Sequence, residues 1–405
     1  MSEAPAKPKQ PRINLRRPDV MEQVTAEVAR HYHSTLVEKI RDAGGTYRAG
    51  KTTIKLASEF GFCYGVERAI DLAYASRRVF PDERIFLIGE IIHNPDVNRQ
   101  LADMRIESLP WREMDASYDE LTANDVVIVP AFGAPVAFVE KIEAQGCRIV
   151  DTTCGDVMKV WRRVREYTRD GFTSIIHGKA GHEETRATAS RALGVDGSGH
   201  YLVVLTLDDA DAVCDFIRQG GDKRAFLDRF AGAHSDEFDP DVHLARVGVA
   251  NQTTMLKSET EEIQRRVRGA IVARDGGEDG AFRVFDTICG ATQERQDALF
   301  DLLREPPDLL IVVGGYNSSN TAHLVEIAEP VTPTFFIRNA DCIESLEQIV
   351  HFDLHAKSEL RGSLAAWLDP VREVTVGITA GASCPANLIE ETIRRVLALR
   401  GEAAV

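Results

Sequence analysis

The chain has 405 residues, of which 44% are hydrophobic and 27% are charged, as is typical of a globular protein with two or three domains. Its formal net charge of −15 argues against nucleic acid as the main partner, because proteins that bind a phosphate backbone are usually basic. No apolar run reaches the roughly 18 residues that a membrane-spanning helix needs, so we expect no membrane association. A small anionic substrate is compatible with this composition, since a pocket can be locally positive on an acidic protein.

The first 18 residues are basic and rich in proline, and no apolar segment follows them. A secretory signal requires such a segment, and the stretch is too short and too poor in serine to suggest a transit peptide. We therefore expect a cytoplasmic protein with a mobile N-terminal arm. Residues 19–42 predict a helix, so that 1–50 form the arm and this helix. Its apolar side chains recur at helical spacing: Val20, Val24, Val28 and Leu36.

From residue 51 onward, short apolar runs rich in β-branched residues alternate with helical patterns. Examples are RIFLIGEII, DVVIVPAF, DLLIVVGG and EVTVGITAG, each of which ends in a turn of small or polar residues. Continuous apolar strands that alternate with helices predict an α/β fold with parallel sheets covered on both faces. Ligands of such sheets bind beyond the carboxyl ends of the strands, where these turns lie.

An internal repeat divides this part of the chain. The segment DTTCGDVMKVW closely matches DTICGATQERQ, and EFGFCYGVERAI has the same layout of strand, cysteine and helix. Three such units predict three α/β domains with small parallel sheets, in a pseudo-threefold arrangement around a shared centre. We place these domains at 51–151, 152–286 and 287–405, the last of which ends in a helix.

Each unit offers one cysteine at a predicted helix start: Cys63, Cys154 and Cys289. A thiol at this position lies at the positive end of the helix dipole, which lowers its pKa and favours binding of a metal. If the three thiolates converge, they suit a cubane iron–sulfur cluster with one open iron. A zinc site with three Cys and one His is the competing metal site. Three small buried residues at strand ends would explain the repeat equally well.

The remaining cysteines are widely spaced, and none of the seven forms a local CxxC pair, which excludes an ordinary zinc ribbon. Without an export signal, a reducing compartment is the better assumption, so disulfides are a poor explanation for them. We assign these cysteines a structural role: Cys147, Cys214, Cys342 and Cys384.

Polar turns follow five of the predicted strands: HNPDVN from His93, GHEET from Gly181, NQTT from Asn251, GGYNSSNT from Gly314 and TAGASCP from Thr379. The NSSNT turn places hydroxyls and an amide at a helix start, where backbone N–H groups bind anions. Helix capping explains any one such turn, whereas five together favour a ligand site. His93 and His182 could bind metal or phosphate or simply pack, and Glu184 could be an acid/base or a solvated carboxylate.

Eight motifs occur in an order that resembles one family: GFCYGVERAI, EIIHNP, DTTC, GHEET, NQTT, ICxATQERQ, GGxNSSNT and GxTAGAS. This family is 4-hydroxy-3-methylbut-2-enyl diphosphate reductase, in the longer form of plants and cyanobacteria. The resemblance covers roughly residues 50–400. It implies a three-domain α/β enzyme of the non-mevalonate isoprenoid pathway, which removes the substrate hydroxyl reductively to give isopentenyl and dimethylallyl diphosphate.

The resemblance also implies roles for individual residues. Cys63, Cys154 and Cys289 match the three ligands of one [4Fe–4S] cluster with one open iron. Glu184 matches the carboxylate that delivers protons to the substrate hydroxyl, and Thr253 matches its neighbour in that relay. Five residues match the groups that hold the diphosphate: His93, His182, Ser318, Asn320 and Ser383. Ser319 lies in the same turn as Ser318 and Asn320. The shorter bacterial form has a histidine where Phe132 stands, so one diphosphate contact is missing or supplied elsewhere.

Electrons come, by the same resemblance, from a small carrier such as ferredoxin or flavodoxin. The helix after Cys154 carries basic residues that could dock an acidic carrier, although a solvated basic face is the simpler alternative. These residues are Lys159, Arg162, Arg163 and Arg165. Two other functions stay open: a redox-neutral iron–sulfur hydro-lyase, and a non-catalytic protein that binds an iron–sulfur cluster or zinc. Turnover without an electron donor would favour the first, and metal analysis separates zinc from iron.

Overall fold

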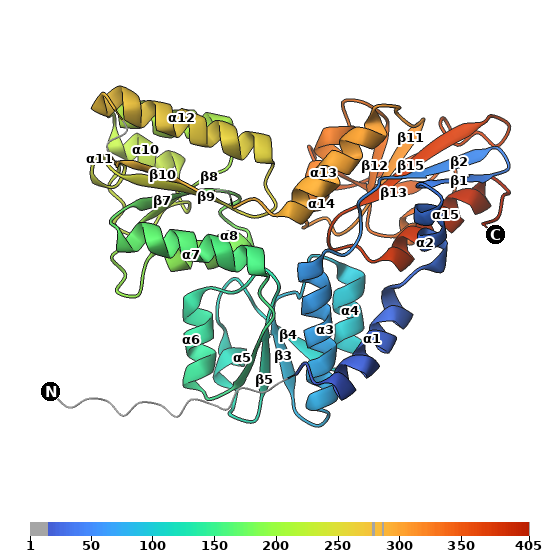
Figure 1. Ribbon diagram of the computed structural model, residues 1–405, viewed down its shortest axis with the longest axis horizontal. Helices are drawn as coiled ribbons and strands as arrows, with labels where there is room; N and C mark the ends of the chain where they lie inside the picture. Colours follow the sequence, from blue (N-terminus) through green and yellow to red (C-terminus); the bar gives the residue numbers. More distant parts are fainter. Residues whose placement is uncertain (1–14, 278–279, 286, 405) are drawn as a thin grey trace.

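The computed structural model describes residues 15–277, 280–285 and 287–404. It has the expected α/β fold, in which three lobes with separate sheets surround a common centre (Figure 1). Residues 1–14 of the expected arm and Asp286, at an expected boundary, lie outside the described residues. Of the helices in the described part, none has both the length and the apolar character to cross a membrane.

The N-terminal segment forms two helices where the sequence predicts one, α1 (Pro18–Tyr32) and α2 (Thr35–Asp42). The break occurs because Ser34 adopts an extended conformation and its side chain accepts a hydrogen bond from the N–H of Val37 at 3.0 Å. A serine at this position satisfies a free N–H at the helix start, so it begins a new helix. As a result α1 packs against the first lobe, whereas α2 packs against the third.

The first lobe contains a parallel sheet in the order β4-β3-β5-β6. Its strands are β3 (Ile85–Ile88), β4 (Ile106–Leu109), β5 (Val126–Val129) and β6 (Arg148–Asp151). Its helices are α3 (Tyr64–Val79), α4 (Pro95–Asp103), α5 (Ala116–Asp119) and α6 (Val136–Ala144). The strands β3 and β5 are buried at every position, as expected for a sheet that helices cover on both faces.

The second lobe contains a parallel sheet in the order β10-β9-β7-β8. Its strands are β7 (Thr173–His177), β8 (Tyr201–Val204), β9 (Val247–Asn251) and β10 (Phe282–Val284). Its helices are α7 (Gly155–Arg169), α8 (Glu183–Ala192), α9 (Leu207–Gln219), α10 (Lys223–Arg229), α11 (Pro240–His243) and α12 (Lys257–Asp275). The end of β7 leads towards α8, and the end of β9 leads towards α12, so both turns lie at the carboxyl edge of the sheet.

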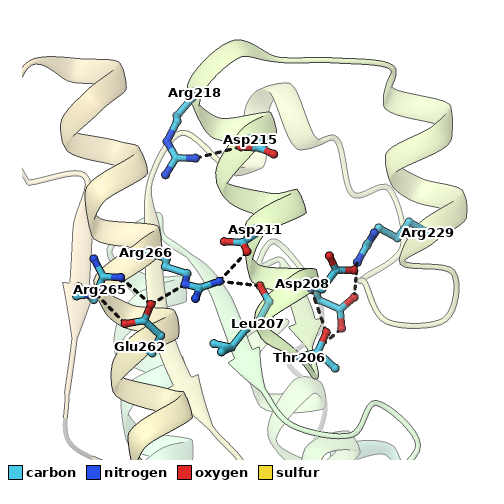
Figure 2. Close-up of polar contacts among 11 residues, drawn as sticks. Thr206, Leu207, Asp208, Asp211, Asp215, Arg218, Arg229, Glu262, Arg265 and Arg266 are labelled. Carbon is cyan, nitrogen blue, oxygen red and sulfur yellow. Dashed lines mark hydrogen bonds and ion pairs between the residues drawn. The ribbon is translucent and has the colours of Figure 1, made fainter.

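Helices α9 and α12 pack side by side on the outer face of this lobe, and an ion pair joins them at their edge (Figure 2). Arg266 of α12 donates to Asp211 of α9 at 2.6 Å, and within α12 it also donates to Glu262 at 2.7 Å. Exposed ion pairs of this kind stabilise a fold by about 1 kcal/mol at most. The buried apolar contacts between Val213, Ile263 and Val267 therefore hold the two helices together, and the charges fix their alignment.

The third lobe contains a mixed sheet in the order β1-β2-β15-β11-β12. Its strands are β1 (Thr46–Ala49), β2 (Thr52–Leu56), β11 (Leu309–Val313), β12 (Thr334–Ile337) and β15 (Val374–Ala380). Around it lie α13 (Gly290–Leu303), α14 (Ser319–Ala328), α15 (Ala386–Leu399), a 3₁₀ turn η1 (Ala340–Cys342) and a hairpin of β13 (Ile349–Asp353) and β14 (Ser358–Gly362).

The expected domain boundary at residue 51 is wrong for β2. This strand pairs in parallel with β15 and antiparallel with β1, so residues 46–56 belong to the third lobe and not to the first. Its buried side chains Ile54 and Leu56 pack in the same core as Val376 and Ile378. The chain therefore enters the third lobe, leaves it after β2 to form the other two lobes, and returns at α13 (Figure 1).

Candidate functional site

The three cysteines predicted to be metal ligands each cap the N-terminus of a helix from a different lobe. Cys63 precedes α3, Cys154 precedes α7 and Cys289 precedes α13. The sulfur atoms of Cys63 and Cys154 lie within 4 Å of one point, the position that a Cβ atom on Gly65 would take, at 3.8 Å and 2.6 Å. The thiol of Cys289 donates to Asp156, in the first turn of α7, at 3.3 Å. The three thiols thus meet where the lobes meet.

The pKa values of Cys154 and Cys289 are raised, whereas their positions at helix starts predict a lowered pKa. Burial raises the pKa of Cys289 to about 12, although the N–H of Thr292 opposes this shift. Burial also raises the pKa of Cys154, against hydrogen bonds from the N–H groups of Asp156 and Val157. Desolvation therefore outweighs the helix N-terminus at these two thiols. A bound cation would reverse this balance, because it neutralises the thiolate charge inside the protein.

One cavity of about 110 Å³ lies at the junction of the three lobes. All eleven residues that the sequence singled out as site residues line it: Cys63, His93, Cys154, His182, Glu184, Thr253, Cys289, Ser318, Ser319, Asn320 and Ser383. They come from polar turns that are distant in sequence and that meet because each follows a strand whose carboxyl end faces the centre. The cavity therefore combines soft thiol ligands, an acid and several neutral donors.

Glu184 is the acid of this cavity, and its side chain is 3% exposed. One carboxylate oxygen accepts from the N–H of Thr253 at 2.6 Å and the other from the Thr253 hydroxyl at 3.0 Å. Burial raises the pKa of Glu184 to about 7, and these two hydrogen bonds lower it only in part. Near neutral pH the group can therefore both hold a proton and release it, as a general acid requires.

His93 and His182 present nitrogen atoms to the cavity from two different lobes. The Nδ1 atom of His93 lies 3.0 Å from Glu90, and its buried Nε2 has no hydrogen-bond partner among the described residues. The Nδ1 atom of His182 accepts from the N–H of Glu184 at 3.1 Å, and burial lowers the pKa of His182 well below its usual value. His182 is therefore neutral, with its remaining proton on Nε2, where it can donate to an anion.

Phe132 lies against His93, with ring centroids 4.7 Å apart and an angle of 10° between the ring planes. The position that carries a histidine in the shorter form of the family thus contributes an apolar face here. This stacking fixes the ring of His93, while Glu90 fixes its rotation through Nδ1. Phe132 adds no polar group to the cavity, but it restricts the movement of the His93 ring, which is a polar group of the cavity.

The first turn of α14 supplies hydroxyl and amide groups from the third lobe. Ser318 caps the helix and accepts from the N–H of Thr321 at 3.3 Å. Asn320 accepts from the N–H of Ala382 at 2.9 Å, and its buried side-chain N–H₂ has no partner among the described residues. The hydroxyl of Ser383 donates to the carbonyl of His93 at 3.3 Å. The turn therefore offers an unpaired donor and a helix N-terminus to an anion.

Sequence reasoning did not assign a role to Gln252, although it lies in the NQTT motif. Its side-chain N–H₂ donates to Ser319 at 3.1 Å and to Thr254 at 2.7 Å, and its oxygen accepts from Thr185 at 3.1 Å. Gln252 thus joins the second lobe to the first turn of α14. Asp156, the partner of Cys289, was missed in the same way, because neither contact is visible in the spacing of residues along the chain.

The four remaining cysteines are buried. Cys384 packs with the core of the third lobe and is absent from the lining of the central cavity. Cys147, Cys214 and Cys342 lie in the cores of the first, second and third lobes respectively. These four cysteines lie in apolar cores and do not line the central cavity, which agrees with the structural role expected for them.

Comparison with known proteins is consistent with this geometry. A family model described as LytB protein matches residues 54–397. A protein of Thermosynechococcus vestitus named 4-hydroxy-3-methylbut-2-enyl diphosphate reductase is 48% identical over 387 residues, which are 95% of this chain and 94% of the relative. A protein of Gloeobacter violaceus with the same name is 49% identical over 386 residues, which are 94% of this chain and 90% of the relative.

Two solved structures are also similar. One, described as the structure of (E)-4-hydroxy-3-methyl-but-2-enyl diphosphate reductase, the terminal enzyme of the non-mevalonate pathway, has a TM-score of 0.51 and 26% identity, and the match covers 85% of this chain and 98% of the other. The other, a reductase from Plasmodium falciparum, has a TM-score of 0.60 and 20% identity, over 84% of this chain and 86% of the other. At that identity the second structure supports the fold alone.

Proposed function

The chain belongs to the LytB family, and we propose that it catalyses the reaction for which its relatives are named, the reduction of 4-hydroxy-3-methylbut-2-enyl diphosphate. The products are isopentenyl and dimethylallyl diphosphate. The observation that carries the proposal is the single cavity in which three thiols, one buried acid and several anion-binding groups meet. A zinc protein would not need all three kinds of group together, and an iron–sulfur hydro-lyase differs from the proposed reductase in that it needs no reductant.

The metal site fits one [4Fe–4S] cluster held by Cys63, Cys154 and Cys289, with one iron left open. Thiolates are the preferred ligands of such clusters, and three of them leave one iron without a protein ligand. Gly65 keeps free the space beside two of the sulfurs, since a Cβ there would lie 2.6 Å from the Cys154 sulfur. When bound, the cluster supplies electrons and an open coordination position for the substrate hydroxyl.

The diphosphate tail is held by groups that include two buried nitrogen atoms without a hydrogen bond in the described part of the chain. The side-chain N–H₂ of Asn320 and the Nε2 atom of His93 are buried without a hydrogen-bond partner among the described residues, and Nε2 has only the Glu183 carboxylate at 3.7 Å nearby. A phosphate oxygen therefore recovers free energy that these two groups lose when they form no hydrogen bond. His182, the serines of the α14 turn and Ser383 complete this set. The N-terminus of α14 adds a favourable dipole to the same anion.

The proton for the departing hydroxyl comes from Glu184. Its carboxyl group can be protonated near neutral pH, and within the described part of the chain each of its oxygens accepts a single hydrogen bond, from Thr253. Thr253 holds the carboxyl group in a single orientation, so that the acidic proton faces the reacting end of the substrate. Such an orientation converts an encounter of separate groups into a reaction within one complex.

The reaction consumes two electrons, so it also needs a donor, which we propose to be a small carrier of the ferredoxin or flavodoxin class. The test is anaerobic purification followed by an assay with the diphosphate substrate and a chemical reductant. We expect both isomeric products, and formation only when the reductant is present. Conversion of the substrate without reductant would favour the hydro-lyase, and a zinc-loaded protein without activity would contradict the proposal.

A further inference from the structure

A groove on the outer side of α7 remains unused by the reaction described above. This α7 groove has a volume of about 610 Å³ and is lined by Met158, Trp161, Arg162, Arg165, Arg169 and Arg191, with Asp151 and Glu166 also at its wall. Four arginines around one groove are unexpected on a chain with a formal net charge of −15. The groove therefore has more basic than acidic side chains in its lining, whereas the chain as a whole is acidic.

The basic residues of α7 differ in how far their charges are already neutralised. Lys159 pairs with Asp156 at 2.7 Å, and Arg163 pairs with Glu166 at 2.8 Å. Arg162 and Arg165 are exposed and form no ion pair with any residue in the described ranges. The structure thus narrows the basic face predicted for this helix to two free guanidinium groups, which are available to an external anion or acidic surface.

The floor of the α7 groove reaches a proposed metal ligand. Trp161 is 6% exposed and packs in one apolar cluster with Val157 and Cys154. The guanidinium of Arg191 lies over its indole ring at 3.4 Å, which fixes the ring in place. Trp161 lines the groove, whereas Val157 and Cys154 line the central cavity, so this cluster connects the two. Arg162 is about 12 Å along the helix from Cys154 at 1.5 Å per residue.

We propose that the α7 groove is the docking site of the electron donor, an acidic one-electron carrier protein. This inference rests on the proposed function, because only a reductase needs such a partner. Two dockings deliver two electrons; with two protons, the carbon–oxygen bond of the substrate breaks, a carbon–hydrogen bond forms and water leaves. The carrier is oxidised by one electron each time. Arg162 and Arg165 attract the carrier, and Trp161 leads from its docking position towards Cys154.

The charge distribution explains why this surface would be selective. Acidic carriers are repelled by a chain of high negative charge, so productive encounters concentrate where the local charge is positive. The exposed Met158 adds an adaptable apolar contact at the same place, 39% exposed and beside the free arginines. An acidic carrier therefore finds attraction, an apolar contact and a short path to the metal site on one helix.

The test compares two double variants of the metal-loaded protein that change the net charge equally. Arg162→Glu with Arg165→Glu alters the α7 groove, whereas Arg224→Glu with Arg361→Glu alters exposed arginines on α10 and β14. Binding of oxidised plant-type ferredoxin is measured by calorimetry at low and high salt. We expect the Kd to rise roughly tenfold or more for the groove variant at low salt, with a weaker salt dependence, and to change little for the control.

A second measurement separates docking from chemistry. Turnover of the diphosphate with a reduced viologen dye, which needs no docking site, should be the same in wild type and groove variant, whereas turnover with reduced ferredoxin should fall. Equal ferredoxin affinity in the two double variants, or no binding to wild type, would overturn the docking proposal. Failure of wild type to convert the diphosphate with viologen would instead overturn the proposed function, and the binding result would remain separate.

Discussion

Replacement of Glu184 by Gln tests the acid in the central cavity, because it removes the proton and keeps the shape. The amide oxygen of Gln can accept from the N–H of Thr253, as one carboxylate oxygen does at 2.6 Å. The second contact keeps its place but reverses its direction. In wild type the Thr253 hydroxyl donates to the carboxylate at 3.0 Å, whereas in the variant the amide N–H₂ can donate to this hydroxyl. The variant should therefore fold and bind its metal, but lose turnover by about 10² to 10⁴-fold, the usual contribution of a general acid.

The same substitution should change how stability depends on pH. The pKa of Glu184 is raised from 4.5 to about 7 by burial, a difference that corresponds to about 3 kcal/mol. Below pH 4.5 the carboxyl is protonated in both the folded and the unfolded chain, so it favours neither. As the pH rises to about 7, the unfolded chain ionises first and the folded wild type loses stability. The Gln variant has no such loss.

Urea unfolding of the metal-free protein at about pH 4.5 and about pH 8 measures this difference. We expect the Gln variant to gain up to about 3 kcal/mol on wild type between these two pH values. Glu140→Gln, at an exposed position on α6, is the matched control and should gain nothing. Identical pH dependence of wild type and the Glu184 variant would show that the carboxyl ionises normally, and near-wild-type turnover would remove Glu184 from the mechanism.

Three further substitutions test the rest of the cavity. Gly65→Ala places a Cβ atom 2.6 Å from the Cys154 sulfur and should lower the iron content of the purified protein. Gly155→Ala is the control, because its Cβ meets no atom within 4 Å and the iron content should not fall. Equal iron content in both variants would refute the proposal that Gly65 keeps space free for the cluster. Asn320→Ala leaves the N–H of Ala382 unpaired, and this loss should cost about 1–3 kcal/mol of stability. The variant also lacks a buried donor, so the KM for the diphosphate should rise. An unchanged KM would exclude Asn320 from substrate binding. Phe132→Ala removes the ring stacked on His93, a contact that stabilises the ring by about 0.5–1.5 kcal/mol. The KM should therefore rise up to about tenfold, with little effect on iron content. A loss of iron would point to a role of Phe132 at the metal site instead.

The sequence predicted the parts of the site that depend on local pattern. A cysteine with a glycine one or two residues after it and a helical period beyond marks a helix start, and Cys63, Cys154 and Cys289 are all found there. The polar turns after apolar strands likewise mark the carboxyl edges of parallel sheets, which is why the candidate residues share one cavity. The roles of the individual residues came from the order of the motifs, which resembles that of one family. The spacing of residues along the chain could not have predicted these roles.

The features that the sequence did not predict depend on contacts between distant segments. The strand β2 pairs with β15, more than 300 residues later, and nothing in its own pattern selects that partner over a strand of the first lobe. The raised pKa of Cys289 follows from burial of the thiol, which outweighs the helix N-terminus that the sequence makes visible. The link from Gln252 to Ser319 has the same origin, since it joins two lobes.

The most direct test of the account is the iron and sulfide content of anaerobically purified single variants. The account predicts about four iron and four sulfide per chain in wild type. Each of Cys63→Ser, Cys154→Ser and Cys289→Ser should lose most of both, while Cys214→Ser, in the core of the second lobe, should keep them. Full iron and sulfide in any one of the first three variants would contradict a single cluster held jointly by the three lobes.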